Sequence, residues 1–160
     1  MLFSRDTSTW KDIVNQTYDI EFDYIAIDKH FQIAVLSTFN RAYTPSCVTK
    51  SFDLFLLLDH FIDTLSKSTN AVYARQDNKG KNFNDWQTYG ELGFFAYDNQ
   101  DVHRLNEKEL KQFDIIYKPI TPLLSTQLVG LNKFSEIIPR FNLTFGENIK
   151  FEDLRRSLVE

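Results

Sequence analysis

The sequence predicts a single α+β domain over residues 1–160, in which a mainly antiparallel sheet is packed by amphipathic helices. Three observations lead to this fold class. The chain has 160 residues, which is the size of one domain with one core. Two neighbouring runs of β-branched and aromatic residues predict strands. A later stretch repeats leucine and phenylalanine at helical spacing, which predicts an amphipathic helix.

The two strand-like runs, residues 22–27 and 31–36, predict a β-hairpin whose turn is the polar break "DKH". Apolar side chains occupy both alternating sets of positions in each run, so neither face of the hairpin is plainly solvated. Strands that are apolar on both faces are typical of the centre of a covered sheet. We therefore expect this hairpin to lie centrally, with helices over one face and with loops or a partner over the other.

The stretch "SFDLFLLLDHFIDTLSKS", residues 51–68, predicts the clearest helix of the chain. Ser51 is its expected N-cap, because a serine hydroxyl can accept a hydrogen bond from the first turn. The polar residues, including Asp59 and Asp63, fall mainly on one arc and are expected to be solvated. The apolar residues at helical spacing predict the buried stripe Leu54, Leu57, Leu58, Phe61 and Leu65.

The remaining segments are assigned in chain order. Capping residues and apolar spacing predict a short helix over residues 7–15. A second short helix is predicted between Asn84, as N-cap, and Gly93, as its stop. Strands are predicted at residues 71–75, 94–98, 113–119 and 140–145. Further helices are predicted within residues 128–138 and over residues 151–160.

Composition and charge narrow the classes of partner. Aromatic residues make up 15% of the chain, and such side chains serve small cores and protein interfaces equally well. The formal net charge of −4 argues against nucleic acid as a partner, because binding it begins with cations that neutralise phosphates. An acidic chain instead suits a basic protein partner.

Cysteine usage and hydropathy predict a cytoplasmic protein without a membrane partner. The single cysteine, Cys47, excludes an internal disulfide and a cysteine-based zinc site. The N-terminal residues "MLFSRDTSTWKD" show no basic region followed by an apolar one, so no secretory signal is expected. The longest apolar run, "LFLLL", is far shorter than the roughly 20 residues that cross a bilayer.

No strong catalytic or cofactor signature appears in the sequence. Glycine-rich phosphate loops and histidine pairs with zinc-motif spacing are absent, so no cofactor and no metal are expected. Asp59, His60 and Asp63 form the best local cluster, and a hard cation could bridge the two carboxylates. A solvated acidic helix face is the favoured interpretation. Cys47 leads into a helix, which can activate a thiol, but a small buried filler is the favoured interpretation for it.

The best hint of function lies in loops that carry aromatic and acidic residues. The segment "TFNRAYTP" places Phe39, Arg41 and Tyr43 close together, and arginine with aromatics is the composition of interface anchors. Packing of this loop onto the core is the alternative interpretation. Acidic residues could form a polar rim around such anchors. The predicted partner-binding residues are therefore Phe39, Arg41, Tyr43, Asp59, Asp63, Asp98 and Asp101.

The order of several segments resembles a known group of proteins. The segments "DYIAIDKHFQIAVLSTFN", "YGELGFFAYD" and "FDIIYKPITPL" resemble small, acidic bacterial proteins associated with the immunity proteins of polymorphic toxin systems. The similarity covers residues 23–124. Its motifs are core and turn residues, so no functional residue is carried over. The resemblance implies a protein that binds and neutralises a cognate toxin.

We therefore expect a non-enzymatic protein-binding module of the immunity type, with a basic toxin domain as its partner. Two alternatives stay open. The first is a small hydrolase that uses Cys47 or the cluster of Asp59, His60 and Asp63. The second is a structural homodimer that the apolar face of the hairpin closes.

Overall fold

The structure, a computed structural model, describes residues 7–17, 20–38, 41–75, 83–99 and 111–159. Its helices are α1 (Thr7–Asn15), α2 (Phe52–Asp63), α3 (Asn84–Glu91) and α4 (Phe151–Ser157), with short 3-10 helices η2 (Ser125–Gln127) and η3 (Leu131–Phe134). Its strands are β1 (Asp23–Ile27), β2 (Ile33–Ser37), β3 (Ala71–Tyr73), β4 (Phe95–Asn99), β5 (Gln112–Pro119), β6 (Arg140–Phe141), β7 (Ile149–Lys150) and β8 (Leu158–Val159).

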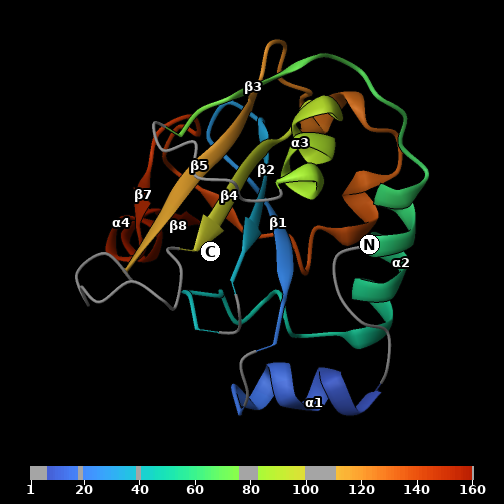
Figure 1. Ribbon diagram of the computed structural model, residues 1–160. Helices are drawn as coiled ribbons and strands as arrows, with labels where there is room; N and C mark the ends of the chain where they lie inside the picture. Colours follow the sequence, from blue (N-terminus) through green and yellow to red (C-terminus); the bar gives the residue numbers. More distant parts are fainter. Residues whose placement is uncertain (1–6, 18–19, 39–40, 76–82, 100–110, 160) are drawn as a thin grey trace.

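These strands form one eight-stranded, mostly antiparallel sheet, so the predicted α+β fold class is confirmed (Figure 1). The strand order is β3–β5–β4–β2–β1–β6–β8, and β7 pairs with β5. The hairpin β1–β2 is antiparallel, whereas β2 pairs parallel to β4 and β1 pairs parallel to β6. The predicted central position of the hairpin is therefore confirmed.

The hairpin is buried on both faces by the rest of the same chain. Every residue of β2 is buried, and only Asp23 of β1 is partly exposed. Helix α3 lies over one face, where the backbone of Gly90 approaches β3 and β5. The other face meets the C-terminal part of the chain, where Phe145 packs on Phe95 and Phe151 packs on Phe113. The apolar hairpin face that the homodimer alternative requires is therefore covered by the chain itself.

Helix α2 forms as predicted, but a different arc of it is buried. Ser51 is the N-cap, and its hydroxyl oxygen accepts a hydrogen bond from the Leu54 backbone N–H at 3.3 Å. Leu57, predicted to be buried, is 58% exposed. The buried stripe is instead Phe55, Leu58, Asp59 and Ile62. Apolar residues surround most of this helix, so periodicity alone does not select the inner arc.

An aromatic cluster decides how α2 is turned. The ring of Phe55 lies 5.3 Å from that of Trp10 in α1 and 5.3 Å from that of Phe22, which precedes β1. Aromatic pairs at such separations add roughly 0.5–1.5 kcal/mol beyond the burial of their area. This contact directs the Phe55 arc inward, and Leu57 consequently faces out.

Several predicted boundaries differ from the structure. Asn84 is the first residue of α3 rather than its N-cap, whereas Gly93 stops the helix with a left-handed φ of +97°. The strand predicted at residues 140–145 is limited to Arg140–Phe141. The C-terminal helix ends at Ser157, because the next two residues pair with β6 as strand β8. Sheet pairing has overridden a helical pattern there.

Candidate functional site

An apolar groove of about 490 Å³ lies between α2 and η3. Side chains from α2 form one wall, and residues 129–134 form the other. Two of its aliphatic side chains are unusually open to solvent, since Val129 is 94% exposed and Leu57 is 58% exposed. Contiguous exposed apolar surface, when it is large enough, marks a surface that binds another molecule.

Aromatic packing and a glycine build this groove. The ring of Phe61 on α2 lies 5.7 Å from that of Phe134 on η3, which holds the two walls together. Gly130 precedes η3 with a left-handed φ of +94°, a conformation that glycine adopts readily. The turn at this glycine presents Val129 to solvent. The polar side chains at its margin are His60, Thr64 and Lys133.

The groove was not among the predicted binding residues. Leu57 was expected to be buried, and Val129 lies in a segment predicted to be helical. When a helix is apolar on most of its surface, the spacing of its leucines does not show which of them is buried and which is exposed. The sequence therefore did not predict this groove. Only the aromatic contacts of α2 show which leucine is left outside.

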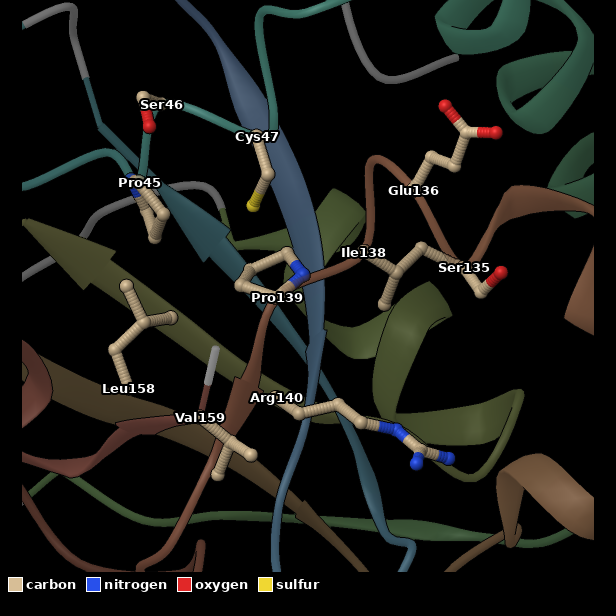
Figure 2. Close-up of a pocket in the computed structure, with 10 residues that line it drawn as sticks. All are labelled: Pro45, Ser46, Cys47, Ser135, Glu136, Ile138, Pro139, Arg140, Leu158 and Val159. Carbon is tan, nitrogen blue, oxygen red and sulfur yellow. The ribbon is translucent and has the colours of Figure 1, made fainter.

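A second hollow, of about 400 Å³, surrounds Cys47 (Figure 2). The sulfur of Cys47 points toward the ring of Pro139, and Leu158 and Val159 lie on the opposite side of the hollow. Burial raises the pKa of the Cys47 thiol, and this effect exceeds the lowering by Lys50. No histidine lines this hollow within the described part of the chain. A thiol with a raised pKa and no neighbouring base is poorly suited to nucleophilic attack.

The charged residues around this hollow are engaged with the same chain. Glu136 lies 3.1 Å from the ammonium group of Lys50. The guanidinium of Arg140 lies 5.8 Å from the ring centre of Phe31. Exposed pairs of this kind contribute little stability, but they fix where the side chains lie. The hydrolase alternative based on Cys47 gains no support from this arrangement.

The predicted cluster on α2 is not brought together on one surface. Asp59 was expected to be solvated, and this prediction is wrong, because it is 0% exposed. His60 and Asp63 are exposed. The position of Asp59 within the buried stripe separates its carboxyl from the outer arc of the helix. Within the described ranges, no group of three or more His, Cys, Asp and Glu side chains could hold a metal ion.

Of the predicted loop anchors, Tyr43 is fixed onto the protein and Arg41 is exposed. The Tyr43 ring lies 5.2 Å from the guanidinium of Arg155 in α4. Its backbone carbonyl accepts a hydrogen bond from the Tyr24 hydroxyl at 3.0 Å. These contacts favour the interpretation that this loop packs onto the core. Phe39 lies outside the described residues.

Asp98 belongs to a row of polar residues that crosses the sheet. Asp23 of β1 pairs with Ser37 of β2, Ser37 pairs with Asp98 of β4, and Asp98 pairs with Asp114 of β5. Cross-strand partners point to the same face, and here that is the face covered by α3. Each of the four residues stands near the end of its strand. The sequence shows that each residue lies near a strand end, but it does not show the strand register that aligns the four residues. Asp101 lies outside the described residues.

The two ends of this polar row are stabilised differently. Asp114 accepts a hydrogen bond from the Gln112 side chain at 2.8 Å and lies 3.9 Å from the guanidinium of Arg75. Asp23 accepts a hydrogen bond from the Tyr89 hydroxyl of α3 at 3.3 Å. Its other oxygen, Oδ1, is shielded from solvent and makes no hydrogen bond to the described residues. The Arg75 cation therefore lies beside Asp114, whereas the neutral phenol of Tyr89 lies beside Asp23.

The carboxyl of Asp23 is electrostatically unfavourable in its charged form. Burial raises its pKa to about 7, and the neighbouring anions Glu21 and Asp98 act in the same direction. The hydroxyls of Ser37 and Tyr89 oppose this change, because hydrogen bonds to a carboxylate favour its charged form. Burial also raises the pKa of Tyr89 well above its usual range, so this phenol stays a hydrogen-bond donor.

Comparisons of the chain with protein-family models, with curated proteins and with solved structures find no match. Among the helices that the structure describes, none combines the length and the apolar character needed to cross a bilayer. Function is therefore inferred from the side chains and surfaces of this chain.

Proposed function

We propose that the protein is a non-enzymatic, cytoplasmic binding module of the immunity type, which neutralises a cognate bacterial toxin by covering part of its surface. The observation that carries this proposal is the apolar groove between α2 and η3, with Leu57 and Val129 exposed in its walls. Keeping two aliphatic side chains in water is unfavourable, and a partner that covers them recovers this free energy.

The groove has the make-up of a binding site with central anchors. Its aromatic walls, Phe61 and Phe134, are held by each other, so little conformational entropy is lost when a partner docks. Burial of apolar surface contributes about 25 cal/mol per Å², and each anchor contributes roughly 1.5–3 kcal/mol when fully covered. A few such anchors commonly supply most of the affinity of an interface.

The net charge of the whole chain, and not the margin of the groove, favours a basic partner. The net charge of −4 attracts a basic partner and speeds its encounter, whereas the apolar groove slows its release. Two exposed carboxyl groups on α2, Asp53 and Asp63, stand on the same helix as Leu57. Because charge controls the encounter and the apolar groove controls the release, the association rate should fall with added salt. The dissociation rate should change little with salt.

The test is a pull-down of tagged protein from its native lysate, with mass spectrometry at low and at moderate salt. The groove variant is Leu57→Asp combined with Val129→Asp. Both positions are exposed, so the fold should tolerate the charges. The matched control is Ile120→Asp, which places a carboxylate on another exposed aliphatic position, 63% exposed, outside the groove.

We expect one stoichiometric partner, a basic protein, with wild type and with the control, and at least a tenfold loss of affinity with the groove variant. A partner that binds the groove variant as tightly as wild type would show that the groove is not the interface. Recovery of only a second copy of the chain, confirmed by light scattering, would replace the toxin-binding proposal with self-association.

A further inference from the structure

We propose that Asp23 is a proton-dependent contact that holds α3 against the central hairpin when its carboxyl is protonated and loosens when the carboxyl is ionised. This inference is independent of the groove and of any toxin. It concerns the polar row on the sheet and helix α3, which lies over it.

The contact joins two segments that are far apart in the sequence. Asp23 opens β1, and Tyr89 lies in the last turn of α3, 66 residues later. Tyr89 is only 7% exposed, so its hydroxyl must find a partner inside the protein. Asp23 is that partner, at 3.3 Å from the hydroxyl. Elsewhere α3 rests mainly on β3, β4 and β5, and this bond connects it to β1.

Among the described residues, the groups whose charge or hydrogen bonds act on this contact are acidic or neutral. Ser37 of β2 and Asp98 of β4 stand beside Asp23 in the sheet, and Glu21 precedes it. The charges of Asp85 in α3 and Asp59 in α2 act on the Tyr89 hydroxyl at the other end of the bond. The charged groups acting on the Asp23 carboxyl are Glu21 and Asp98, both anionic. Ionisation of Asp23 therefore adds a negative charge to a site that already repels it.

The consequence is a change in how firmly α3 is held. The neutral carboxyl can donate its own proton to a neighbouring oxygen and carries no charge that needs water. The ionised carboxyl keeps the Tyr89 bond but leaves Oδ1 buried without a hydrogen bond to the described residues. Opening of α3 lets water reach that oxygen. The opened state thus gains from ionisation, and opening becomes more frequent as pH rises.

The direction and range of the effect follow from the two states of the carboxyl. Its pKa is about 7 when α3 is closed, and a solvated aspartate has a pKa near 3.9. The closed state therefore binds the proton more tightly. Closure is most favourable below about pH 4, weakens as pH rises toward 7, and changes little above that value. Between pH 5.5 and 8.5 the opening equilibrium should increase on the order of ten- to thirtyfold.

The experiment combines two measurements on the full chain. Carbon-detected NMR follows the titration of the Asp23 carboxyl directly. Hydrogen exchange of the α3 amides, corrected for the intrinsic effect of pH, reports opening of the helix. The variants are Asp23→Asn, which cannot ionise, and Asp53→Asn, which removes an exposed carboxyl from α2 as the matched control. Tyr89→Phe removes only the hydroxyl that favours the ionised carboxyl.

We expect a carboxyl midpoint near 7 in wild type and in Asp53→Asn, and a higher midpoint in Tyr89→Phe. Protection of the α3 amides should fall with pH in wild type and in Asp53→Asn and stay level in Asp23→Asn. A wild-type midpoint near 4, or equal loss of protection in Asp23→Asn, would overturn the proposal. Should Asp23→Asn fail to fold, the wild-type and Tyr89→Phe titrations still decide it.

Discussion

Two aspartates at the central hairpin show how local hydrogen bonds decide the role of a residue. Asp28, directly after β1, is 4% exposed and accepts hydrogen bonds from three backbone N–H groups. Two of these donors belong to the hairpin turn, and the third is the N–H of Phe145 from the far end of the chain. Asp23, five residues earlier, is partly exposed and accepts a long hydrogen bond of 3.3 Å from the Tyr89 hydroxyl, while its Oδ1 makes no hydrogen bond to the described residues. The first carboxylate is a structural clamp, and the second is an unfavourable charge.

Substitution Asp28→Ala should destabilise the fold by about 2–4 kcal/mol. It leaves three N–H donors without their acceptor, at 2.8, 2.9 and 3.0 Å in the wild-type protein. Chemical denaturation at pH 7 measures the free energy of unfolding. Asp53→Ala serves as the control, because its carboxyl is exposed at the first turn of α2 and should cost less than about 1 kcal/mol. Equal losses in the two variants would contradict the clamp role of Asp28.

At the scale of elements, α3 is positioned by a close backbone approach and by side-chain bonds at its two ends. An added Cβ at Gly90 would lie 2.6 Å from the Cβ of Ala71 and 3.2 Å from that of Tyr117. The indole N–H of Trp86, near the start of the helix, donates to the Tyr97 carbonyl at 3.2 Å. These contacts hold α3 on β3 and β5 beside its Tyr89 bond to Asp23.

Substitution Gly90→Ala should destabilise the protein by about 1–3 kcal/mol, although alanine is the better helix former. The gain in helix propensity is about 1 kcal/mol, and the collision with Ala71 on β3 outweighs it. Thermal and chemical denaturation both report the change. Gln87→Ala, at an exposed position of the same helix, should shift stability by no more than about 0.5 kcal/mol. A stabilised Gly90→Ala variant would show that α3 does not sit this close to the sheet.

At the scale of the whole molecule, one sheet joins the N-terminal hairpin to the C-terminal strands. Strand β6 pairs with β1, and β8 pairs with β6, so the last part of the chain completes a sheet begun near its start. Contacts between such distant segments make unfolding cooperative. An unfavourable charge at Asp23 should therefore lower the stability of the whole molecule as well as that of α3.

The global stability difference between Asp23→Asn and wild type should depend on pH. The folded-state pKa of Asp23 is about 7, above the unfolded value near 3.9, so ionisation costs the folded state stability as pH rises between these values. Relative to wild type, Asp23→Asn should gain roughly 3–4 kcal/mol between pH 4 and pH 8. Denaturant titrations at both pH values measure this gain. If the stability difference between Asp23→Asn and wild type were the same at both pH values, the charged Asp23 carboxyl would be solvated in the folded protein. That outcome would contradict this prediction.

The elements with strong local signals were predictable from the sequence. The hairpin around "DKH", the N-cap Ser51 and the stop at Gly93 all follow from local chemistry, and all three are present. The partner-binding residues were less predictable. Tyr43 turned out to hold its own loop, and Asp59 turned out to be buried. Loop composition describes interfaces and packed loops equally well, so it could not separate the two.

The sequence by itself determined the fold class, the central hairpin and the existence of α2, because periodicity and capping act over a few residues. Only the tertiary structure decided which arc of α2 faces solvent, and hence the groove of Leu57 and Val129. It also decided the register that places Asp23 beside Ser37 and beneath Tyr89. Both outcomes depend on contacts between residues far apart in the chain. A local pattern cannot encode such contacts, because many partners would satisfy it equally.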